Sequence, residues 1–219
     1  MDSRLSKNHS IRTFISLPLS ASARASLGSL QTAFSEVAPI IRRTHPDLLH
    51  ITVVFLGDVP SHRIDDVIAA GRREANRARP LDLSLSDLGA FPNQSAPRIL
   101  WAGLRRDAGL ARLEEIQSGL AATLRGEGFE LEDRPFRPHI TLARARPTAN
   151  RSDLQRLGRC LVEVRERTRP DDQIHVSGLD VMRSDLSPSG PAYTLLAVAP
   201  FPRISAPHAE SGGEPDAVG

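Results

Sequence analysis

A His-Ile-Thr triplet occurs twice in this chain of 219 residues, as His50-Ile51-Thr52 and as His139-Ile140-Thr141. Each triplet opens an apolar run, HITVVFLGDV in the first case and HITLAR in the second, and such runs are typical of partly buried β-strands. Alternate side chains of a strand point to the same face, so the His and the Thr point together and the Ile points the other way, into a core. The sequence therefore predicts two strands that each present an imidazole beside a hydroxyl.

The hydrophobic periodicity of the rest of the chain predicts helices that alternate with strands. Gly57-Asp58 is a turn signal and is expected to end the first triplet strand, and residues 89–97 are expected to form a loop. The predicted strands span 11–17, 50–56, 81–88, 98–104, 139–144, 173–182 and 192–199, and the predicted helices span 20–37, 61–78, 107–126 and 152–167.

The order of these elements repeats, and this predicts two related units. Helix, triplet strand, helix, strand and strand follow one another over about residues 20–104 and again over 107–199, at an offset of about 90 residues. The expected fold is α+β and bilobal, with two pseudo-symmetric helix/antiparallel-sheet lobes around a central cleft. We expect one bilobal domain over residues 1–203, in which the triplet strands face each other, and a disordered polar tail over 204–219.

Composition narrows the class of protein. The single cysteine, Cys160, excludes an internal disulfide framework and a cysteine-based metal site. No apolar stretch reaches membrane-spanning length and the first ten residues lack the apolar region of a signal peptide, so a cytoplasmic location is expected. Almost all of the basic residues are Arg, with Lys7 the one lysine. Arginine binds phosphate well, but this bias is more often a feature of coding composition than of a ligand.

Two histidines across a cleft suit displacement at phosphorus. A neutral imidazole can take a proton from water while an imidazolium gives one to the leaving oxygen, and the unperturbed pKa of histidine allows both forms near neutral pH. The Thr52 and Thr141 hydroxyls can bind the non-bridging oxygens. Arg144 is a further phosphate candidate. Strict alternation from His139 puts it on the opposite face, so it reaches the cleft only if the strand bends or ends there.

Other uses of histidine fit the sequence less well. Neither triplet has a carboxylate or a third histidine at ligand spacing, and no HExxH, GxSxG or glycine-rich phosphate loop is present. We therefore expect neither a metal nor a cofactor. His175-Val176-Ser177 imitates a triplet, but in the repeat His175 aligns with Ser84 and not with the triplet strands. We interpret His175 as an ordinary strand residue.

With these flanks the paired triplets resemble a known family. The segments IRTFISLPL, HITVVFLGDV and RPFRPHITLAR are similar to the two-histidine phosphoesterase superfamily, and most similar to its RNA 2′,3′-cyclic phosphodiesterase branch, also called 2′-5′ RNA ligase. The segments GAFPNQSAPRILWAGL and SDLSPSGPAYTLL resemble the same branch. The resemblance covers about residues 11–202.

This resemblance implies a bilobal fold with a central cleft and the metal-independent hydrolysis of RNA 2′,3′-cyclic phosphate ends to 2′-phosphates. It implies that His50 is the proton donor and His139 the proton acceptor, with Thr52 and Thr141 binding phosphate. The sequence departs from the family at Val53-Val54, where the family more often has Leu and a basic or polar residue, and this bears on the polarity of the cleft.

The expected partner is RNA or an oligonucleotide with a 2′,3′-cyclic phosphate, and the protein is expected to be a monomer. Two alternatives stay open: 2′-5′ ligation of RNA, which is the reverse reaction, and a non-catalytic RNA-binding module. Phe14, which lies beside Arg12 in the first predicted strand, is a candidate for stacking on a base.

Overall fold

The computed structural model describes residues 9–168, 173–187 and 190–202. Four α-helices lie in this part of the chain: α1 (Ala21–Thr32), α2 (Ile64–Arg77), α3 (Ala108–Gly126) and α4 (Arg151–Arg167). The strands are β1 (Ser10–Pro18), β2 (Ile41–Arg43), β3 (His50–Pro60), β4 (Leu81–Phe91), β5 (Ile99–Leu104), β6 (His139–Ala145), β7 (Gln173–Val176), β8 (Gly178–Ser187) and β9 (Gly190–Pro200). Short 3₁₀ turns span Ser35–Ile40 (η1), Pro46–Leu48 (η2) and Ser61–Arg63 (η3).

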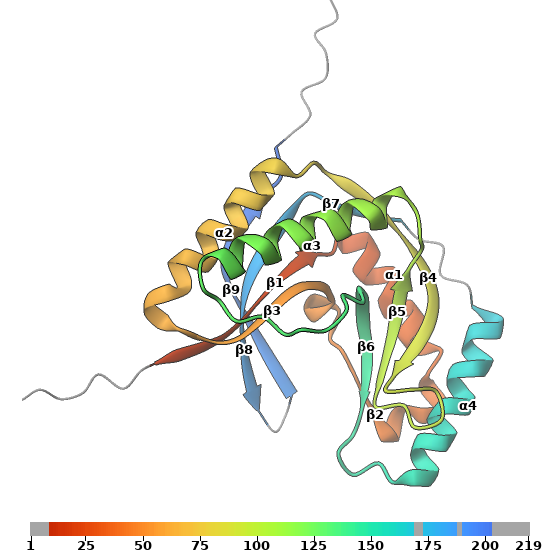
Figure 1. The fold of residues 1–219 in the computed structure, drawn as a ribbon. Coiled ribbons are helices and arrows are strands. Elements are labelled where there is room, and N and C mark those ends of the chain that lie inside the picture. The colour runs from red at the N-terminus through yellow and green to blue at the C-terminus, as the bar shows by residue number, and fades with distance from the viewer. Residues whose placement is uncertain (1–8, 169–172, 188–189, 203–219) are drawn as a thin grey trace, which may run out of the picture.

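The strands form one curled antiparallel sheet (Figure 1). Its order is β7-β4-β5-β6-β3-β1-β8-β9, and β2 pairs with β6 outside this path. The two triplet strands, β3 and β6, are neighbours at the centre of the sheet, where Ile51 pairs with Ile140. Both isoleucines are fully buried, as the alternation of the triplets predicts. The expected α+β fold with two helix-and-antiparallel-sheet halves is confirmed.

The two halves of the sheet do not follow the order of the chain. Strands β4 and β5 come between the two triplets in the sequence, yet both belong to the half of β6, where β5 pairs with β6 and β4 pairs with β5. The other half joins the first strand of the chain, β1, to the last two, β8 and β9, beside β3. Each half therefore combines strands from both predicted units. The bounds of the repeat itself stay a prediction, and the predicted tail lies outside the described residues.

Helices α1, α3 and α4 begin at residues whose side chains cap the first turn, whereas α2 follows η3 without such a cap. The Ser20 hydroxyl accepts a hydrogen bond from the amide of Ala23 at 3.2 Å at the start of α1, and an Asp107 carboxylate oxygen accepts one from Leu110 at 3.0 Å at the start of α3. Their apolar faces pack on the sheet: α2 contacts β8 and β9, α4 contacts β4 and α1 contacts β6. This layer encloses the core and leaves the other face of β3 and β6 for polar side chains.

Some predicted boundaries are wrong. The helix predicted over 20–37 ends at Thr32, and the chain continues as η1 and the unpredicted strand β2. The strand predicted over 173–182 is divided between β7 and β8. Strand β3 does not end at Gly57-Asp58, because Gly57 adopts a left-handed conformation (φ 69°) inside the strand. It lies next to a bulge at Leu56, which has no partner in β1.

Among the helices of the described residues, none has the length and the apolar character that crossing a membrane would require.

Candidate active site

A β-bulge in β6 brings Arg144 to the face of the triplet. Leu100 of β5 pairs with Ala143 and Trp101 pairs with Thr141, so Leu142 has no partner. Leu142 and Ala143 are both buried, and this extra inward residue reverses the alternation. Arg144 therefore shares a face with His139 and Thr141. The bulge is the irregularity that Arg144 needs in order to reach the cleft, as expected from the alternation of the sequence.

Strand β3 has the same bulge after the first triplet. Ile15 of β1 pairs with Val54 and Ser16 pairs with Thr52, so Val53 has no partner. Val53 and Val54 are both buried. The departure from the family pattern at these two positions therefore does not reach the cleft surface, and Phe55 takes the position in β3 that Arg144 takes in β6.

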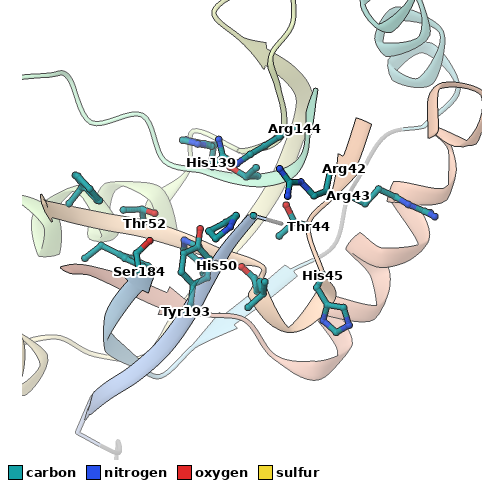
Figure 2. Close-up of a pocket in the computed structure, with 16 residues that line it drawn as sticks. Arg42, Arg43, Thr44, His45, His50, Thr52, His139, Arg144, Ser184 and Tyr193 are labelled. Atoms are coloured by element: carbon teal, nitrogen blue, oxygen red, sulfur yellow. Dashed lines mark hydrogen bonds between the residues drawn. The ribbon is translucent and has the colours of Figure 1, made fainter. Parts of the chain in front are cut away.

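All of the predicted site residues line one pocket of about 400 Å³. Its walls come from β1, β3 and β6, from residues 42–48 and from the β8–β9 hairpin (Figure 2). The residues that the sequence singled out are Phe14, His50, Thr52, His139, Thr141 and Arg144. The structure adds Arg42, Arg43, Thr44, His45, Leu48, Phe55, Ser184, Gly190, Pro191 and Tyr193.

Each of the two triplet histidines is oriented by a backbone carbonyl two residues earlier. Nδ1 of His50 donates to the carbonyl of Leu48 at 2.7 Å, and Nδ1 of His139 donates to the carbonyl of Arg137 at 2.7 Å. A carbonyl only accepts hydrogen bonds, so Nδ1 carries the proton and Nε2 is left to accept or donate one. The two imidazoles are thus prepared in the same way for proton transfer at Nε2.

Burial and neighbouring charge lower the pKa of both histidines. Desolvation is the main cause at each, and the hydrogen bond from Nδ1 acts in the opposite direction. The positive charge of Arg144 lowers the pKa of both rings, and His139 adds to the effect at His50. The free protein therefore favours neutral imidazoles, and a bound anion would favour their protonation.

Aromatic rings hold the two imidazoles in place. His50 lies 5.0 Å from Phe14 and 5.2 Å from Tyr193 between ring centroids. His139 lies 5.0 Å from Phe91 and 6.3 Å from Trp101. Phe91 and Trp101 were missed in the sequence because β4 and β5 carry no motif that links them to a histidine.

Phe14 is too deeply buried to serve as a stacking platform. Only 3% of its surface is exposed, and its ring packs against His50 and Tyr193. The buried Phe14 ring instead supports the imidazole of His50 from below the pocket surface. Tyr193 and Phe55 are the aromatic pocket residues with partly exposed surfaces.

Positive charge dominates the pocket. Its lining among the described residues includes three arginines and contains neither Asp nor Glu. The described residues also hold no group of three or more His, Cys, Asp or Glu side chains suited to a metal ion. Neither the Thr52 nor the Thr141 hydroxyl bonds to a described side chain or backbone group. The site is therefore suited to an anion with several oxygen atoms.

His175 lies away from this site. It stands on β7, where its Nδ1 contacts a carboxylate oxygen of Asp82 at 2.8 Å on the adjacent strand β4. Both side chains are exposed at the surface. This position agrees with the prediction that His175 is an ordinary strand residue.

Comparison with known proteins identifies the family. The model of the LigT like phosphoesterases matches residues 17–101 and 106–193. The chain belongs to this family.

Two relatives show how far the family likeness extends. An RNA 2′,3′-cyclic phosphodiesterase of Thermus thermophilus is 32% identical over 190 residues, which is 85% of this chain and 88% of the relative. A protein of the same name from Geobacillus stearothermophilus is 35% identical over 131 residues, which is 60% of this chain but only 41% of the relative.

Solved structures agree on the fold. A crystal structure of a Thermus thermophilus protein superposes with a TM-score of 0.69 at 29% identity and covers 87% of this chain and 98% of that one. LigT of E. coli in its apo form superposes with a TM-score of 0.67 at 22% identity and covers 89% of this chain and 99% of that one. At 22% identity, the similarity to E. coli LigT is evidence for the fold alone.

Proposed function

We propose that this protein hydrolyses RNA 2′,3′-cyclic phosphate ends to 2′-phosphates without a metal ion. One observation carries the proposal: two imidazoles with matched backbone hydrogen bonds at Nδ1 line a pocket that also holds two threonine hydroxyls and Arg144. The names of the curated relatives support the choice of substrate. An RNA substrate also fits the cytoplasmic location that the sequence predicts.

The two histidines supply the proton transfers. Nε2 of His139 takes a proton from water as the water oxygen bonds to phosphorus on the side opposite O3′. The bond between phosphorus and O3′ breaks, and O3′ takes the proton from Nε2 of His50. The products are a free 3′ hydroxyl and a 2′-phosphate. His139 is then protonated and His50 is neutral, and exchange of protons with solvent restores their starting states.

The remaining polar groups hold the phosphoryl oxygens. Thr52 and Thr141 donate from their hydroxyls, and Arg144 adds a guanidinium fork that matches phosphate geometry. The anion raises the pKa of His50, which is lowered in the free protein, so substrate binding itself favours the protonated donor. The nucleobase lies against the partly exposed rings of Tyr193 and Phe55.

The test is an assay of oligonucleotides that end in 2′,3′-cyclic phosphate, with the position of the product phosphate determined. We expect a 2′-phosphate. A 3′-phosphate product would reverse which oxygen leaves, and intact substrate would contradict the proposed hydrolysis. Joining of the cyclic end to an RNA with a 5′ hydroxyl would reveal the reverse reaction.

Replacing either triplet histidine, His50 or His139, with alanine should reduce kcat by at least about a hundredfold, since positioned acid–base groups contribute on that scale. His175→Ala is the matched control, because His175 is an exposed histidine on a strand outside the pocket. It should retain wild-type kcat. If His50→Ala and His139→Ala bind RNA normally and the wild type opens no cyclic phosphate, the chain is an RNA-binding module instead.

A further inference from the structure

Two arginines stand opposite each other on paired strands beside the proposed reaction centre. Arg42 of β2 is the register partner of Arg144 of β6. Residues directly opposite in an antiparallel pair point to the same face of the sheet. Figure 2 shows the Arg42 and Arg144 side chains directed towards the cleft, whereas the Arg43 side chain points away from it.

No acidic side chain among the described residues forms an ion pair with either of these arginines. Within the described part of the chain, neither Arg42 nor Arg144 takes part in an ion pair, and the pocket lining holds no carboxylate. Like charges directly opposite on paired strands destabilise a sheet. An arrangement that costs folding energy in the free protein is favourable once an anion lies between or beside the two guanidinium groups.

The two arginines differ in their effect on the histidines. The charge of Arg144 acts on both His50 and His139, whereas Arg42 is not among the groups that shift either ring. The guanidinium of Arg42 instead extends to the β8–β9 hairpin, since a Cβ at Gly190 would lie 2.7 Å from one of its terminal nitrogens. Arg42 therefore extends from β2 to the start of β9, and both ends of this contact line the pocket.

We propose that Arg42 forms a second anion subsite, which binds the next phosphate of the substrate. That phosphate is the 5′-phosphate of a single nucleotide, or the linking phosphodiester of an oligonucleotide, on the nucleotide that carries the cyclic end. The pocket volume of about 400 Å³ is in the range of sites that hold a small ligand. The assignment of the cyclic end to the reaction centre rests on the proposed function, while the anion subsite rests on the arginine geometry.

Equilibrium binding tests the subsite without turnover. The probes are adenosine 2′-phosphate and adenosine 2′,5′-bisphosphate, titrated calorimetrically into the wild type and into Arg42→Gln. We expect the wild type to bind the bisphosphate about tenfold more tightly, the scale of one charge-assisted hydrogen bond, and Arg42→Gln to lose this preference. Arg151→Gln is the control, at an exposed position on α4 outside the pocket, and should keep the wild-type ratio of Kd values.

Turnover separates the subsite from the proposed reaction. The ratio of kcat/KM for adenosine 2′,3′-cyclic phosphate with and without a 5′-phosphate should fall by about tenfold in Arg42→Gln and stay unchanged in Arg151→Gln. An equal loss on both substrates, or an unchanged binding ratio, would overturn the subsite. If the binding preference depends on Arg42 but the wild type hydrolyses neither substrate, the anion subsite stands and the proposed function fails.

Discussion

At the scale of single residues, the site places two imidazoles and a guanidinium in one partly buried pocket. Burial lowers the pKa of both histidines below the ordinary value of 6.5, and Arg144 lowers it further. Acid–base catalysis needs one ring neutral and the other protonated. The free protein therefore reaches the required pair of states in acidic solution, and we expect kcat/KM to be bell-shaped with its maximum below pH 6.5.

Replacement of Arg144 with Gln tests this electrostatic relation. Removal of a positive charge favours the protonated form of both imidazoles, so both limbs of the kcat/KM profile should move to higher pH. The rate at the optimum should fall by about a hundredfold through the loss of a phosphate contact. The measurement is kcat/KM across the acidic and neutral range. Limbs that stay in place would show that Arg144 does not act on the histidines.

At the scale of elements, one buried side chain connects α1 to the bulge that positions Arg144. Gln31 is 4% exposed, and its Nε2 donates to the carbonyls of Thr44 at 2.8 Å and of Leu142 at 2.7 Å. The amide of Thr44 donates to the same Leu142 carbonyl. Gln31 thus joins the residues after β2 to the unpaired residue of β6, and we assign it a positioning role.

Gln31→Met should separate this role from simple packing. Methionine nearly preserves the side-chain volume but cannot donate. The partly buried carbonyl of Thr44 and the buried carbonyl of Leu142 each lose a hydrogen bond, at a cost of about 1–3 kcal/mol in the free energy of unfolding. Denaturant unfolding measures this cost. Thr32→Ala, at an exposed position on the same helix, is the control. We also expect kcat/KM to fall in Gln31→Met under conditions where the protein is fully folded, and an unchanged value would contradict the positioning role.

Local alternation predicts the faces of the triplets well and that of Arg144 poorly. The alternation of His50, Ile51 and Thr52 between the two faces follows from strand geometry alone. It can be predicted without knowledge of the neighbouring strands. The bulge at Leu142 depends on pairing with β5, which comes about 40 residues earlier in the chain. Strand β2 has three residues and no periodicity to detect. Arg42 and Tyr193 carry no local signal either, since the fold alone brings them to the histidines.

At the scale of the whole molecule, the site lies at the seam between the two halves of the sheet. β3 and β6 meet through one residue pair, Ile51 and Ile140, and the triplets emerge beside it. Resemblance to a family predicts this architecture, but the interleaving of strands between the halves requires the observed topology. If strands are assigned to the two halves in sequence order, β4 and β5 are placed with β3, whereas in the structure they lie with β6.

Hydrolysis should not depend on divalent cations. The described residues offer no cluster of three metal-ligating side chains, and the pocket supplies positive charge from arginines instead. We expect kcat with a cyclic-phosphate oligonucleotide to be unchanged, within about twofold, after treatment with a chelator. A complete loss of activity that added Mg²⁺ or Mn²⁺ restores would contradict the two-imidazole mechanism.

The matched bulges of β3 and β6 have a consequence for how a substrate enters. A site assembled from two equivalent strands would by itself accept a ligand in either of two orientations related by its symmetry, and one of them would exchange the attacking and leaving oxygens. Phe55 and Arg144 occupy corresponding positions after the bulges, yet one is apolar and the other charged. This difference makes the two orientations unequal and gives the pocket a direction. Under the proposed mechanism it sets which histidine meets water and which meets the departing ribose oxygen.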